Sequence, residues 1–451
     1  MKGILDFILL RRHMYRASAA AIRRYQENRV LRLVRHAIRY SPFYSNLYKD
    51  IRIRSLDDFR KLPSINKRIM MENFDNLNTC GLKLAEVMAF AVEKEMNRDF
   101  LGYFRDEYVI GLSSGTSGNK GIYVTPKELT RRLPFVFLAR SGIPLHLLPF
   151  RILFLLRVFS QGFADIHAPF IHLQYMATMT PIPELLKAVN DSRINILMAP
   201  PSLVRLLLPR RQEILIPLKM IVCYAEVLEV EERKRFQEAF GAQVIEIYQA
   251  SEGQIGSACR CGNLHINEDL VYVELLDESG NPVTGGDGPA SRMLVTNLVN
   301  LAQPLIRHEM NDMVVLGGKC PCGSSFRTIR NVLGRRDDII WLKNRGGILQ
   351  HVFPDLISRW IITSSDGIRE FQVVQVSDNA LRIVVELAED GGEARKSVMA
   401  LLSQRMEREL GCFDIAADIE ILFETIRLPE NMAKYKRFVN KARSSGSGLQ
   451  G

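Results

Sequence analysis

Two short turns of this 451-residue chain hold four of its seven cysteines. The first turn, 259–262, reads Cys-Arg-Cys-Gly and is followed by His265; the second, 320–323, reads Cys-Pro-Cys-Gly. Paired thiols in short turns, with an imidazole beside them, are typical ligands of structural Zn²⁺, which takes four. We therefore predict a zinc site, against the alternative of unliganded thiols in loops. Five ligands compete for four places, because Cys259 and Cys261 are both sterically possible.

A loop rich in glycine and hydroxyl groups follows a predicted strand at 108–112. It spans 113–121 and reads Ser-Ser-Gly-Thr-Ser-Gly-Asn-Lys-Gly. Its backbone N–H groups and hydroxyl groups can all face an anion, and Lys120 adds a positive charge. The loop lacks the spacing of the common P-loop motif. Because an ordinary surface turn does not need so many hydroxyl groups, we predict phosphate binding ahead of a turn.

A third segment, 246–253, reads Glu-Ile-Tyr-Gln-Ala-Ser-Glu-Gly and lies at the carboxyl end of a predicted parallel strand. Ligands of open α/β sheets bind at that end. Tyr248 can stack on a nucleotide base, and Glu252 can hold Mg²⁺ through a hard oxygen ligand. Aromatic and acidic residues are common at strand ends, so this segment indicates a site only together with the others.

The elements that must position these residues alternate between strand and helix through the middle of the chain. This pattern favours a parallel α/β sheet. The expected strands are 152–157, 194–199, 220–224 and 244–248, and the expected helices are 182–190, 202–208 and 230–240. From 270 onward strand patterns dominate, and a small antiparallel β subdomain is expected from 271–276, 292–297 and 313–316.

A charged joint at 334–338, Gly-Arg-Arg-Asp-Asp, divides the chain. Beyond it we expect strands at 338–342, 369–376, 381–387 and 416–423 and helices near 352–362 and 393–409. The predicted fold class is α/β, with a large N-terminal domain, residues 1–334, hinged to a small α+β C-terminal lid domain, residues 335–443. Residues 444–451 read as a flexible tail.

Composition and charge exclude several classes of function. Apolar residues make up 47% and charged residues 24% of the chain, which excludes a largely disordered protein. The net charge of +10 comes from the two ends, so we expect no nucleic-acid-binding surface on the body. Seven cysteines are too few for a disulfide framework in a chain this long, and we find no convincing targeting or membrane segment. We expect a cytoplasmic protein.

Residues 1–40 read as helix with a basic stripe, and the stripe has two interpretations. A solvated helix face is favoured. Contact with an anionic membrane or an acidic partner is the alternative. A homodimer is also open.

Taken in order, these segments resemble the adenylate-forming enzymes, which include acyl-CoA synthetases, adenylation domains of peptide synthetases and luciferases. The resemblance rests on the loop 113–121, Ala-Glu at 225–226, the segment 248–252, Arg-His-Glu-Met-Asn-Asp at 307–312 and the joint 334–338. The stretches 36–44 and 62–67 and the Cys/His set are similar to the phenylacetate–CoA ligase branch, including its zinc site. The likeness covers nearly the whole chain.

The resemblance implies an ATP site and a role for each of its residues. The loop 113–118 would cradle the β- and γ-phosphates, Ala225 and Glu226 would border the adenine, and Tyr248 would pack near the base. Asp312, assisted by Arg335, would bind the ribose. The complete set of expected ATP-binding residues is Ser113, Ser114, Gly115, Thr116, Ser117, Gly118, Lys120, Ala225, Glu226, Tyr248, Gln249, Ser251, Asp312 and Arg335.

The resemblance also implies the metal ligands, the hinge and the catalytic lysine. Glu252 would bind Mg²⁺, and Asp337 would be the hinge on which the small domain turns. Lys434 would match the lysine of the family's Gly-Lys-x-Lys-Arg pattern, but Ala433 replaces the glycine, so Lys436 competes for that role. The expected zinc ligands are Cys259, His265, Cys320 and Cys322, with Cys261 as the reserve.

The implied activity is the ATP-dependent conversion of a carboxylic acid into an acyl-AMP with release of pyrophosphate, followed by transfer to coenzyme A. We expect an aromatic acid, bound in a pocket drawn from 157–180. The aromatic residues there are Phe159, Phe163, Phe170 and Tyr175, and core packing is an equal alternative for them. Transfer to an amine is the runner-up activity, and a non-catalytic zinc-containing scaffold is the alternative from another class.

Overall fold

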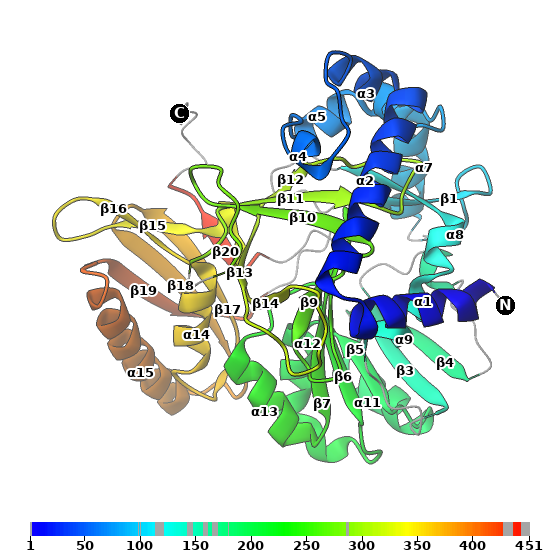
Figure 1. The fold of residues 1–451 in the computed structure, drawn as a ribbon. Helices are drawn as coiled ribbons and strands as arrows, with labels where there is room; N and C mark the ends of the chain where they lie inside the picture. The colour runs from blue at the N-terminus through cyan, green and yellow to red at the C-terminus, as the bar shows by residue number, and fades with distance from the viewer. Residues whose placement is uncertain are drawn as a thin grey trace.

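The computed structural model describes residues 2–97, 99, 101–112, 121–141, 148–156, 161–164, 170–178, 180–285, 288–426 and 436–442. The chain forms a large N-terminal lobe, ending with β14 (Thr328–Arg335), and a smaller C-terminal lobe, residues 340–442. In Figure 1 the C-terminal lobe lies on one side of the large lobe, and α1 and α2 lie on the other. The predicted α/β fold class is confirmed, whereas the exact domain boundaries stay a prediction.

A nine-stranded sheet forms the centre of the large lobe, in the order β13-β14-β9-β8-β7-β6-β5-β3-β4. The neighbours from β4 to β7 are parallel, and those from β7 to β13 are antiparallel. All of β5 is buried, as expected for a parallel strand covered on both faces. The strands are β3 (Phe150–Leu156), β4 (Ile171–Ala177), β5 (Ile196–Ala199), β6 (Met220–Tyr224), β7 (Gln243–Ala250), β8 (Gly253–Ala258), β9 (Leu264–Ile266) and β13 (Asp312–Leu316).

Three helices link the parallel strands: α11 (Ile182–Asp191), α12 (Pro201–Leu207) and α13 (Val230–Phe240). They pack on the sheet through an apolar core in which Leu197 and Phe236 are completely buried. The three helices predicted here begin and end within two residues of these bounds. This arrangement brings the carboxyl ends of β5, β6 and β7 to one edge of the sheet.

A second sheet of β10 (Val271–Leu276), β11 (Arg292–Asn297) and β12 (His308–Met310) is antiparallel, which confirms the prediction for 271–276 and 292–297. The third strand predicted for it, 313–316, instead pairs with β14 in the nine-stranded sheet, and β12 lies beside β11 in its place. The N-terminal segment extends this sheet. Ile65 N donates a hydrogen bond to Arg307 O (3.1 Å) and Ile65 O accepts one from Glu309 N (2.7 Å). The segment that follows, beginning with Lys67, is therefore brought beside β12.

Residues 1–40 form two helices, α1 (Lys2–Arg16) and α2 (Ala19–Tyr40), where one continuous helix was predicted. The break lies at Ser18, because its Oγ accepts a hydrogen bond from Ala21 N (3.2 Å) and caps a new helix. The helix α2 ends at Tyr40, before Ser41-Pro42, because the residue before a proline disfavours the helical conformation. The other elements of the lobe are α3 (Pro42–Leu47), α4 (Leu56–Phe59), α5 (Lys67–Glu72), α6 (Phe74–Leu77), α7 (Leu84–Met96), β1 (Tyr108–Leu112), β2 (Ile122–Pro126), α8 (Lys127–Thr130), α9 (Leu133–Arg140), α10 (Gln161–Ala164) and two 3₁₀ helices, Leu208–Glu213 and Arg336–Asp338.

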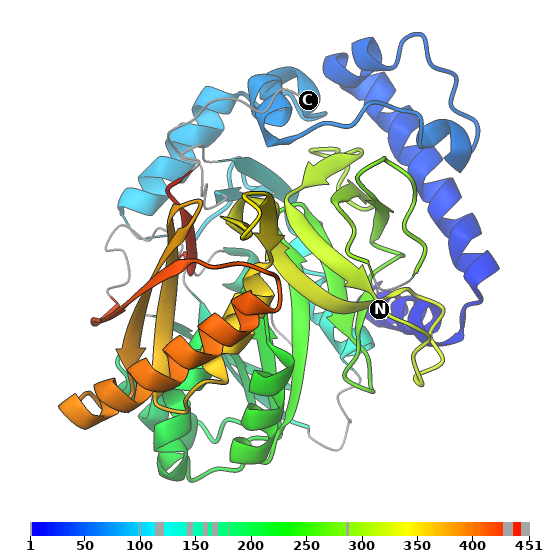
Figure 2. The same cartoon turned by 90° about the vertical axis from the view of Figure 1, so that its left-hand side faces the viewer.

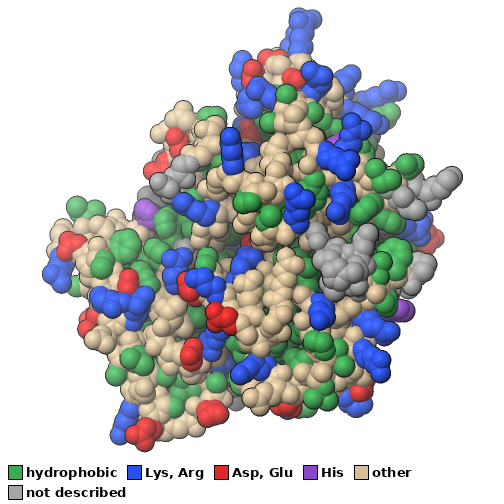
Figure 3. Space-filling view, turned by 60° about the horizontal axis from the view of Figure 1, so that its bottom comes forward, with side chains coloured by type: hydrophobic (Ala, Val, Ile, Leu, Met, Phe, Trp, Pro, Cys, Tyr) green, Lys and Arg blue, Asp and Glu red, His purple; other side chains and the backbone are tan. Residues whose placement is uncertain are grey.

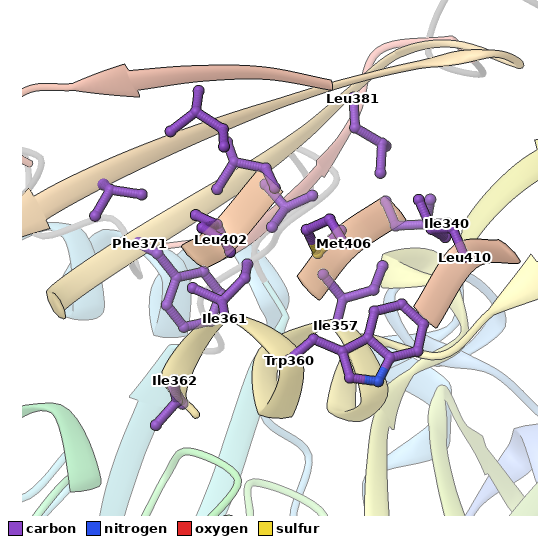
Figure 4. Packing of buried hydrophobic residues seen from close by; sticks show 14 of the residues in the cluster. Ile340, Ile357, Trp360, Ile361, Ile362, Phe371, Leu381, Leu402, Met406 and Leu410 are labelled. Atoms are coloured by element: carbon purple, nitrogen blue, oxygen red, sulfur yellow. The ribbon is translucent and has the colours of Figure 1, made fainter. Parts of the chain in front are cut away.

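The C-terminal lobe contains a four-stranded sheet, β19-β18-β17-β20, with α15 lying across it (Figure 2). Side chains of α14, α15 and the sheet form the lobe's own core, which includes Trp360, Phe371 and Met406 (Figure 4). The final strand pairs in parallel with the central strand β17. The elements are β15 (Ile340–Lys343), β16 (Leu349–Val352), α14 (Pro354–Ile362), β17 (Ile368–Ser377), β18 (Ala380–Leu387), α15 (Gly392–Gly411), β19 (Asp418–Phe423) and β20 (Phe438–Asn440).

Two features are relevant to binding partners: the distribution of basic side chains on the surface and the apolar character of the helices. On the face in Figure 3, basic side chains are spread out, with apolar and acidic residues between them, and do not form one continuous stripe. Across the described parts of the chain, we find no helix with both the length and the apolar character that crossing a membrane requires.

Candidate active site and metal centre

A cavity of about 890 Å³ extends along the carboxyl ends of β6 and β7 and between the two lobes. The parallel strands end at one edge of the sheet, and the C-terminal lobe closes the space beyond that edge. The structure brings nine of the predicted ATP, magnesium and hinge residues to the lining of this cavity. They are Ala225, Glu226, Tyr248, Gln249, Ser251, Glu252, Asp312, Arg335 and Asp337.

The turn at Ala225 and Glu226 has an unusual backbone and a fixed side chain. Ala225 has a φ of +65°, in the left-handed region that residues with a Cβ rarely adopt. The Glu226 carboxylate accepts hydrogen bonds from Ser202 N (3.0 Å) and Ser202 Oγ (2.8 Å), at the start of α12. The first turn of that helix therefore holds the predicted adenine-binding turn against the cavity.

Glu252, the predicted magnesium ligand, is held in place from both sides. Its Oε1 accepts a hydrogen bond from Tyr123 Oη (2.7 Å), and its backbone carbonyl accepts one from Asn297 Nδ2 (2.8 Å). Burial and the negative charge of Glu252 raise the pKa of Tyr123, so its phenol stays a neutral donor. Burial, followed by the charges of Asp312 and Glu252, also raises the pKa of Tyr248.

The predicted ribose and hinge residues lie at the boundary between the lobes. Asp312 and Arg335 are partners in the β13–β14 ladder, and their side chains form a loose ion pair (Arg335 Nε to Asp312 Oδ1, 3.8 Å). Asp337 follows β14 in a single 3₁₀ turn, where its carboxylate accepts a hydrogen bond from Asn311 Nδ2 (2.9 Å). The joint is therefore hydrogen-bonded to Asn311, the residue directly before Asp312.

Two further residues line the cavity near Glu252 and were not singled out from the sequence. His308 is 1% exposed, and neither of its ring nitrogens has a hydrogen-bond partner among the described residues. Lys67 is half-buried and lines the same cavity. Burial lowers the pKa of both side chains, which places a neutral imidazole and a partly desolvated ammonium beside the carboxylate. Lys67 belongs to the segment 62–67, the only sequence signal that pointed toward it.

Several predicted residues lie outside the described residues. These are Lys434, Lys120 and the loop Ser113, Ser114, Gly115, Thr116, Ser117 and Gly118. The flanking strands β1 and β2 pair with each other, and Tyr123 of β2 is the hydrogen-bond donor to Glu252. The competing residue Lys436 lines the cavity, and its carbonyl accepts a hydrogen bond from Gln372 Nε2 (2.8 Å).

The predicted aromatic pocket is only partly described. Phe159 and the side chain of Phe163 lie outside the described residues. Phe170 is exposed, and Tyr175 packs against Phe154 with ring centroids 5.8 Å apart. Tyr175 thus follows the packing alternative, and its partner Phe154 in turn contacts Tyr224, the residue before Ala225, with ring centroids 5.3 Å apart.

A second site is formed by Cys259, His265, Cys320 and Cys322, whose ligand atoms all lie within 4.8 Å of one another. The two Cys-x-Cys-Gly turns have the same form, because Gly262 and Gly323 both adopt a positive φ (+78° and +80°) that closes the turn. Cys261, the reserve ligand, is exposed and is not part of this group. The structure therefore gathers the four ligands that were expected first.

The donor geometry fits a tetrahedral Zn²⁺ ion. Cys259 and Cys320 have their sulfur atoms 3.6 Å apart, and Cys322 Sγ is 3.5 Å from His265 Nε2. Tetrahedral zinc with ordinary bond lengths requires about 3.8 Å between sulfurs and about 3.6 Å between sulfur and nitrogen. His265 Nδ1 donates to Phe326 O (2.9 Å), which leaves the Nε2 lone pair directed at the cluster, as in metal-bound histidines.

The junction of α1 and α2 covers this cluster. Met14 and Ile22 pack with Cys259, Cys322 and Phe326 in one buried group. The sulfur cluster therefore lies beneath a layer of apolar side chains contributed by the first two helices.

A buried ion pair lies beside the same junction. Arg140 and Asp269 are bonded through one guanidinium nitrogen, and both side chains are at most 1% exposed. Arg140 also donates to Leu10 O of α1 (2.7 Å), and His13 of α1 contacts Asp269 (Nδ1 to Oδ2, 3.1 Å). We call this region, from Leu10 to Ile22 with the cluster and the ion pair, the metal corner.

Comparison with known proteins supports the fold at low sequence identity. No family model and no curated protein sequence matches the chain. Among solved structures, 2-hydroxyisobutyryl-CoA ligase in its postadenylation state, in complex with 2-HIB-AMP, superposes with a TM-score of 0.71 at 17% identity, covering 96% of this chain and 92% of that one. The anthranilate CoA ligase AuaEII with anthranoyl-AMP gives a TM-score of 0.52 at 17% identity, over 73% of this chain and 65% of the other.

The match to 2-hydroxyisobutyryl-CoA ligase depends on the state of that enzyme. Its thioesterification state, with 2-HIB-AMP and CoA, gives a TM-score of 0.56 at 18% identity over the same shares of the two chains. The chain therefore has the fold of adenylate-forming ligases, and the resemblance read from the sequence is confirmed at that level. Its lobes are arranged more as in the postadenylation state than as in the thioesterification state.

Proposed function

We propose that this protein uses ATP to convert a carboxylic acid into an acyl-AMP and then transfers the acyl group to coenzyme A. The observation that carries the proposal is the convergence of the predicted nucleotide residues on one cavity between two lobes, in a fold whose solved members hold acyl adenylates. The segments involved are separated by up to about a hundred residues, and core packing alone does not require acidic, aromatic and strained residues to meet at one edge.

In the first step the acid carboxylate attacks the α-phosphorus of ATP, forming a new oxygen–phosphorus bond and releasing pyrophosphate. The protein's task is to align the two reactants and neutralise the crowded negative charge. The turn at Ala225 and Glu226 would border the adenine, Asp312 would hold the ribose hydroxyls, and Glu252 would hold a Mg²⁺ ion. That ion would neutralise phosphate charge, while Tyr123 fixes the carboxylate that binds it.

Lys434 is our proposed catalytic cation for this step, with Lys436 as the competing candidate. Both belong to the segment that precedes β20, the strand that follows the cavity-lining residues 436–437. In the second step the coenzyme A sulfur attacks the acyl carbon, and AMP leaves. The phosphate loop, Ser113 to Gly118 with Lys120, would bind the β- and γ-phosphates in the first step only.

An aromatic acid is the substrate class that we propose. Phe154 packs against Tyr175 and against Tyr224, the residue before Ala225, and we infer that a planar ring would bind near this aromatic group. The runner-up activity, transfer to an amine, uses the same first step. A scaffold without turnover would not need the Tyr123–Glu252 contact at the cavity.

The metal corner would hold a structural Zn²⁺ ion through Cys259, His265, Cys320 and Cys322. All four tetrahedral positions are then supplied by the protein, which is typical of a structural rather than a catalytic zinc.

The test is pyrophosphate release from ATP with a panel of aryl and aliphatic acids, with and without coenzyme A. Acid-dependent release followed by thioester formation is expected. Release without any thioester, and with product only when an amine is added, would favour the amide synthetase. No release with any acid would favour the scaffold. Lys434→Ala and Lys436→Ala, made separately, identify the catalytic lysine by which of them abolishes release.

A further inference from the structure

Five charged side chains connect the two lobes beside the cavity. Arg205 of α12 binds Glu232 of the same lobe (Nε to Oε1, 2.7 Å) and Glu370 of β17 in the other lobe (Nη1 to Oε2, 3.3 Å). Arg437 binds Glu370 (Nε to Oε1, 2.9 Å) and approaches Glu226 of the large lobe (3.8 Å). Positive and negative groups alternate along the whole series.

The series is mostly enclosed, and its two ends differ in solvent access. Arg205 and Glu232 are 4% and 1% exposed, Glu370 and Arg437 are each 14% exposed, and Glu226 is 27% exposed. Ion pairs that exclude most water interact more strongly than surface pairs, and removing one partner leaves the others uncompensated. Glu370 is the central member, because it contacts an arginine from each lobe.

The position of the series links it to the nucleotide site. Glu226 is one half of the adenine-binding turn and is itself fixed by Ser202. Arg437 follows Lys436, and its backbone carbonyl accepts a hydrogen bond from Val373 N of β17 (2.7 Å). The residues that contact the large lobe are therefore on the strand and the segment adjoining the proposed catalytic lysine.

We propose that Glu232, Arg205, Glu370, Arg437 and Glu226 form a lobe latch that holds the C-terminal lobe in the arrangement for adenylation. Arg437 and Glu370 are then positioning residues for the first half-reaction, acting through the segment that carries the lysines. The latch must open before thioester formation, because a turn of the C-terminal lobe moves Glu370 and Arg437 away from Arg205 and Glu226. This inference rests on the proposed function only for its kinetic consequence.

Separate half-reactions test the latch. Arg437→Gln removes a guanidinium from the partly exposed part of the series. Glu370 can still pair with Arg205, and Glu226 can still accept hydrogen bonds from Ser202. We expect pyrophosphate release to fall about tenfold, which corresponds to about 1.4 kcal/mol of lost stabilisation. Thioester formation from presynthesised acyl-AMP and coenzyme A should stay within about twofold or become faster. Arg437→Lys should restore part of the rate of pyrophosphate release.

The matched control is Arg382→Gln, which breaks an exposed pair with Glu420 inside the C-terminal lobe (2.6 Å). Neither half-reaction should change in this variant. If Arg437→Gln slows both half-reactions equally, its role is structural and the latch is wrong; if it slows neither, the latch is also wrong.

Hydrogen–deuterium exchange separates the latch from the activity. In Arg437→Gln and in Glu370→Gln, amide exchange should rise in α12 and at the start of β17, where the lobes meet, and stay unchanged in the core of α15. Unchanged exchange at both sites would overturn the latch. If the parent protein releases no pyrophosphate with any acid, the proposed function fails, and the exchange result alone decides whether the latch exists.

Discussion

The metal corner and the lobe latch each join two parts of the chain through an arginine. At the corner, Arg140 and Asp269 are at most 1% exposed, and the Arg140 guanidinium lies 5.4 Å from the centroid of the Phe326 ring. At the latch, Glu370 and Arg437 each keep 14% of their side-chain surface, and Arg437 lines a cavity large enough for a nucleotide. Water can reach the second arginine but is excluded from the first.

This difference in solvent access determines whether a junction can open. Breaking a fully buried pair leaves a charge without hydration, at a cost of about 3–5 kcal/mol. Charges that stay partly hydrated can separate at a much smaller cost. The corner is therefore suited to permanent attachment of α1 and α2, whereas the latch is suited to the lobe movement that we propose between the two half-reactions.

The largest expected effect is at the corner. Arg140→Met should lower the free energy of unfolding by about 3–5 kcal/mol, because it leaves the Asp269 carboxylate buried without its main partner. Urea unfolding followed by circular dichroism measures the change. The control is Arg132→Gln, which breaks the partly exposed pair between Arg132 and Asp6 of α1 (3.0 Å) and should cost less than about 1 kcal/mol. Equal losses in the two variants would contradict the contrast between buried and hydrated pairs.

Removal of the metal should be the next largest effect. A chelator should lower the melting temperature by roughly 5 °C or more, since metal binding contributes directly to folding. Cys320→Ser should lose most bound zinc, measured by elemental analysis of the purified protein. Cys412→Ser, which changes an exposed thiol of the C-terminal lobe, should keep both its zinc and its melting temperature. Parent protein with far less than one zinc per chain would rule out the metal.

At the cavity, Glu252→Gln should reduce pyrophosphate release by about a hundredfold while the protein stays folded, because an amide cannot supply the negative charge that Mg²⁺ requires. Tyr123→Phe removes only the hydrogen bond to that carboxylate and should cost a few-fold. Unfolding curves of both variants should match the parent. A Glu252→Gln variant with nearly full activity would remove Glu252 from the magnesium site.

The smallest expected effect is on how the free energy of unfolding changes at acidic pH. Burial alone would raise the pKa of Asp269, but the charge of Arg140 and the hydrogen bonds from His13 and Arg140 outweigh it, so the pKa is lowered. A lowered pKa contributes stability above the unfolded-state value of about 3.9, and this contribution is lost as the pH falls through the folded-state pKa. Unfolding free energies between pH 5 and pH 3 should therefore fall less steeply in Asp269→Asn than in the parent. Parallel curves would contradict this assignment.

The two regions also differ in how much of them could be predicted from the sequence. At the corner, each turn is formed by residues that are adjacent in the sequence. A Cys-x-Cys-Gly pattern contains both the cysteines and the glycine that closes the turn. The linking helices and the parallel strands β3, β5, β6 and β7 were equally predictable, because their apolar patterns reflect local periodicity. The parallel strand β4 was not predicted. What remained open was whether Cys259 or Cys261 belongs to the cluster; only Cys259 turns inward, toward the side chains beneath α1 and α2.

The nucleotide cavity was predictable where its residues belong to recognisable segments, and not elsewhere. Glu252, Asp312, Lys67 and His308 all stand in such segments, whereas Tyr123 does not. Lys67 and His308 lie near Glu252, and Tyr123 bonds to it, only because separate strands and the N-terminal segment pack side by side. An unpaired buried histidine cannot be recognised from sequence, because its lack of partners is a property of the packed interior.

The sequence by itself determined the local elements, the two cysteine turns and the segments that resemble adenylate-forming enzymes, because each depends on residues close together in the chain. Only the tertiary structure decided which charges pair across the lobes. Arg205, Glu232 and Glu370 stand in three different elements and Arg437 directly precedes a fourth, and no periodicity relates them. Their pairing follows from the way α12 faces β17 when two separately formed cores come together, and that geometry depends on all the contacts between the lobes at once.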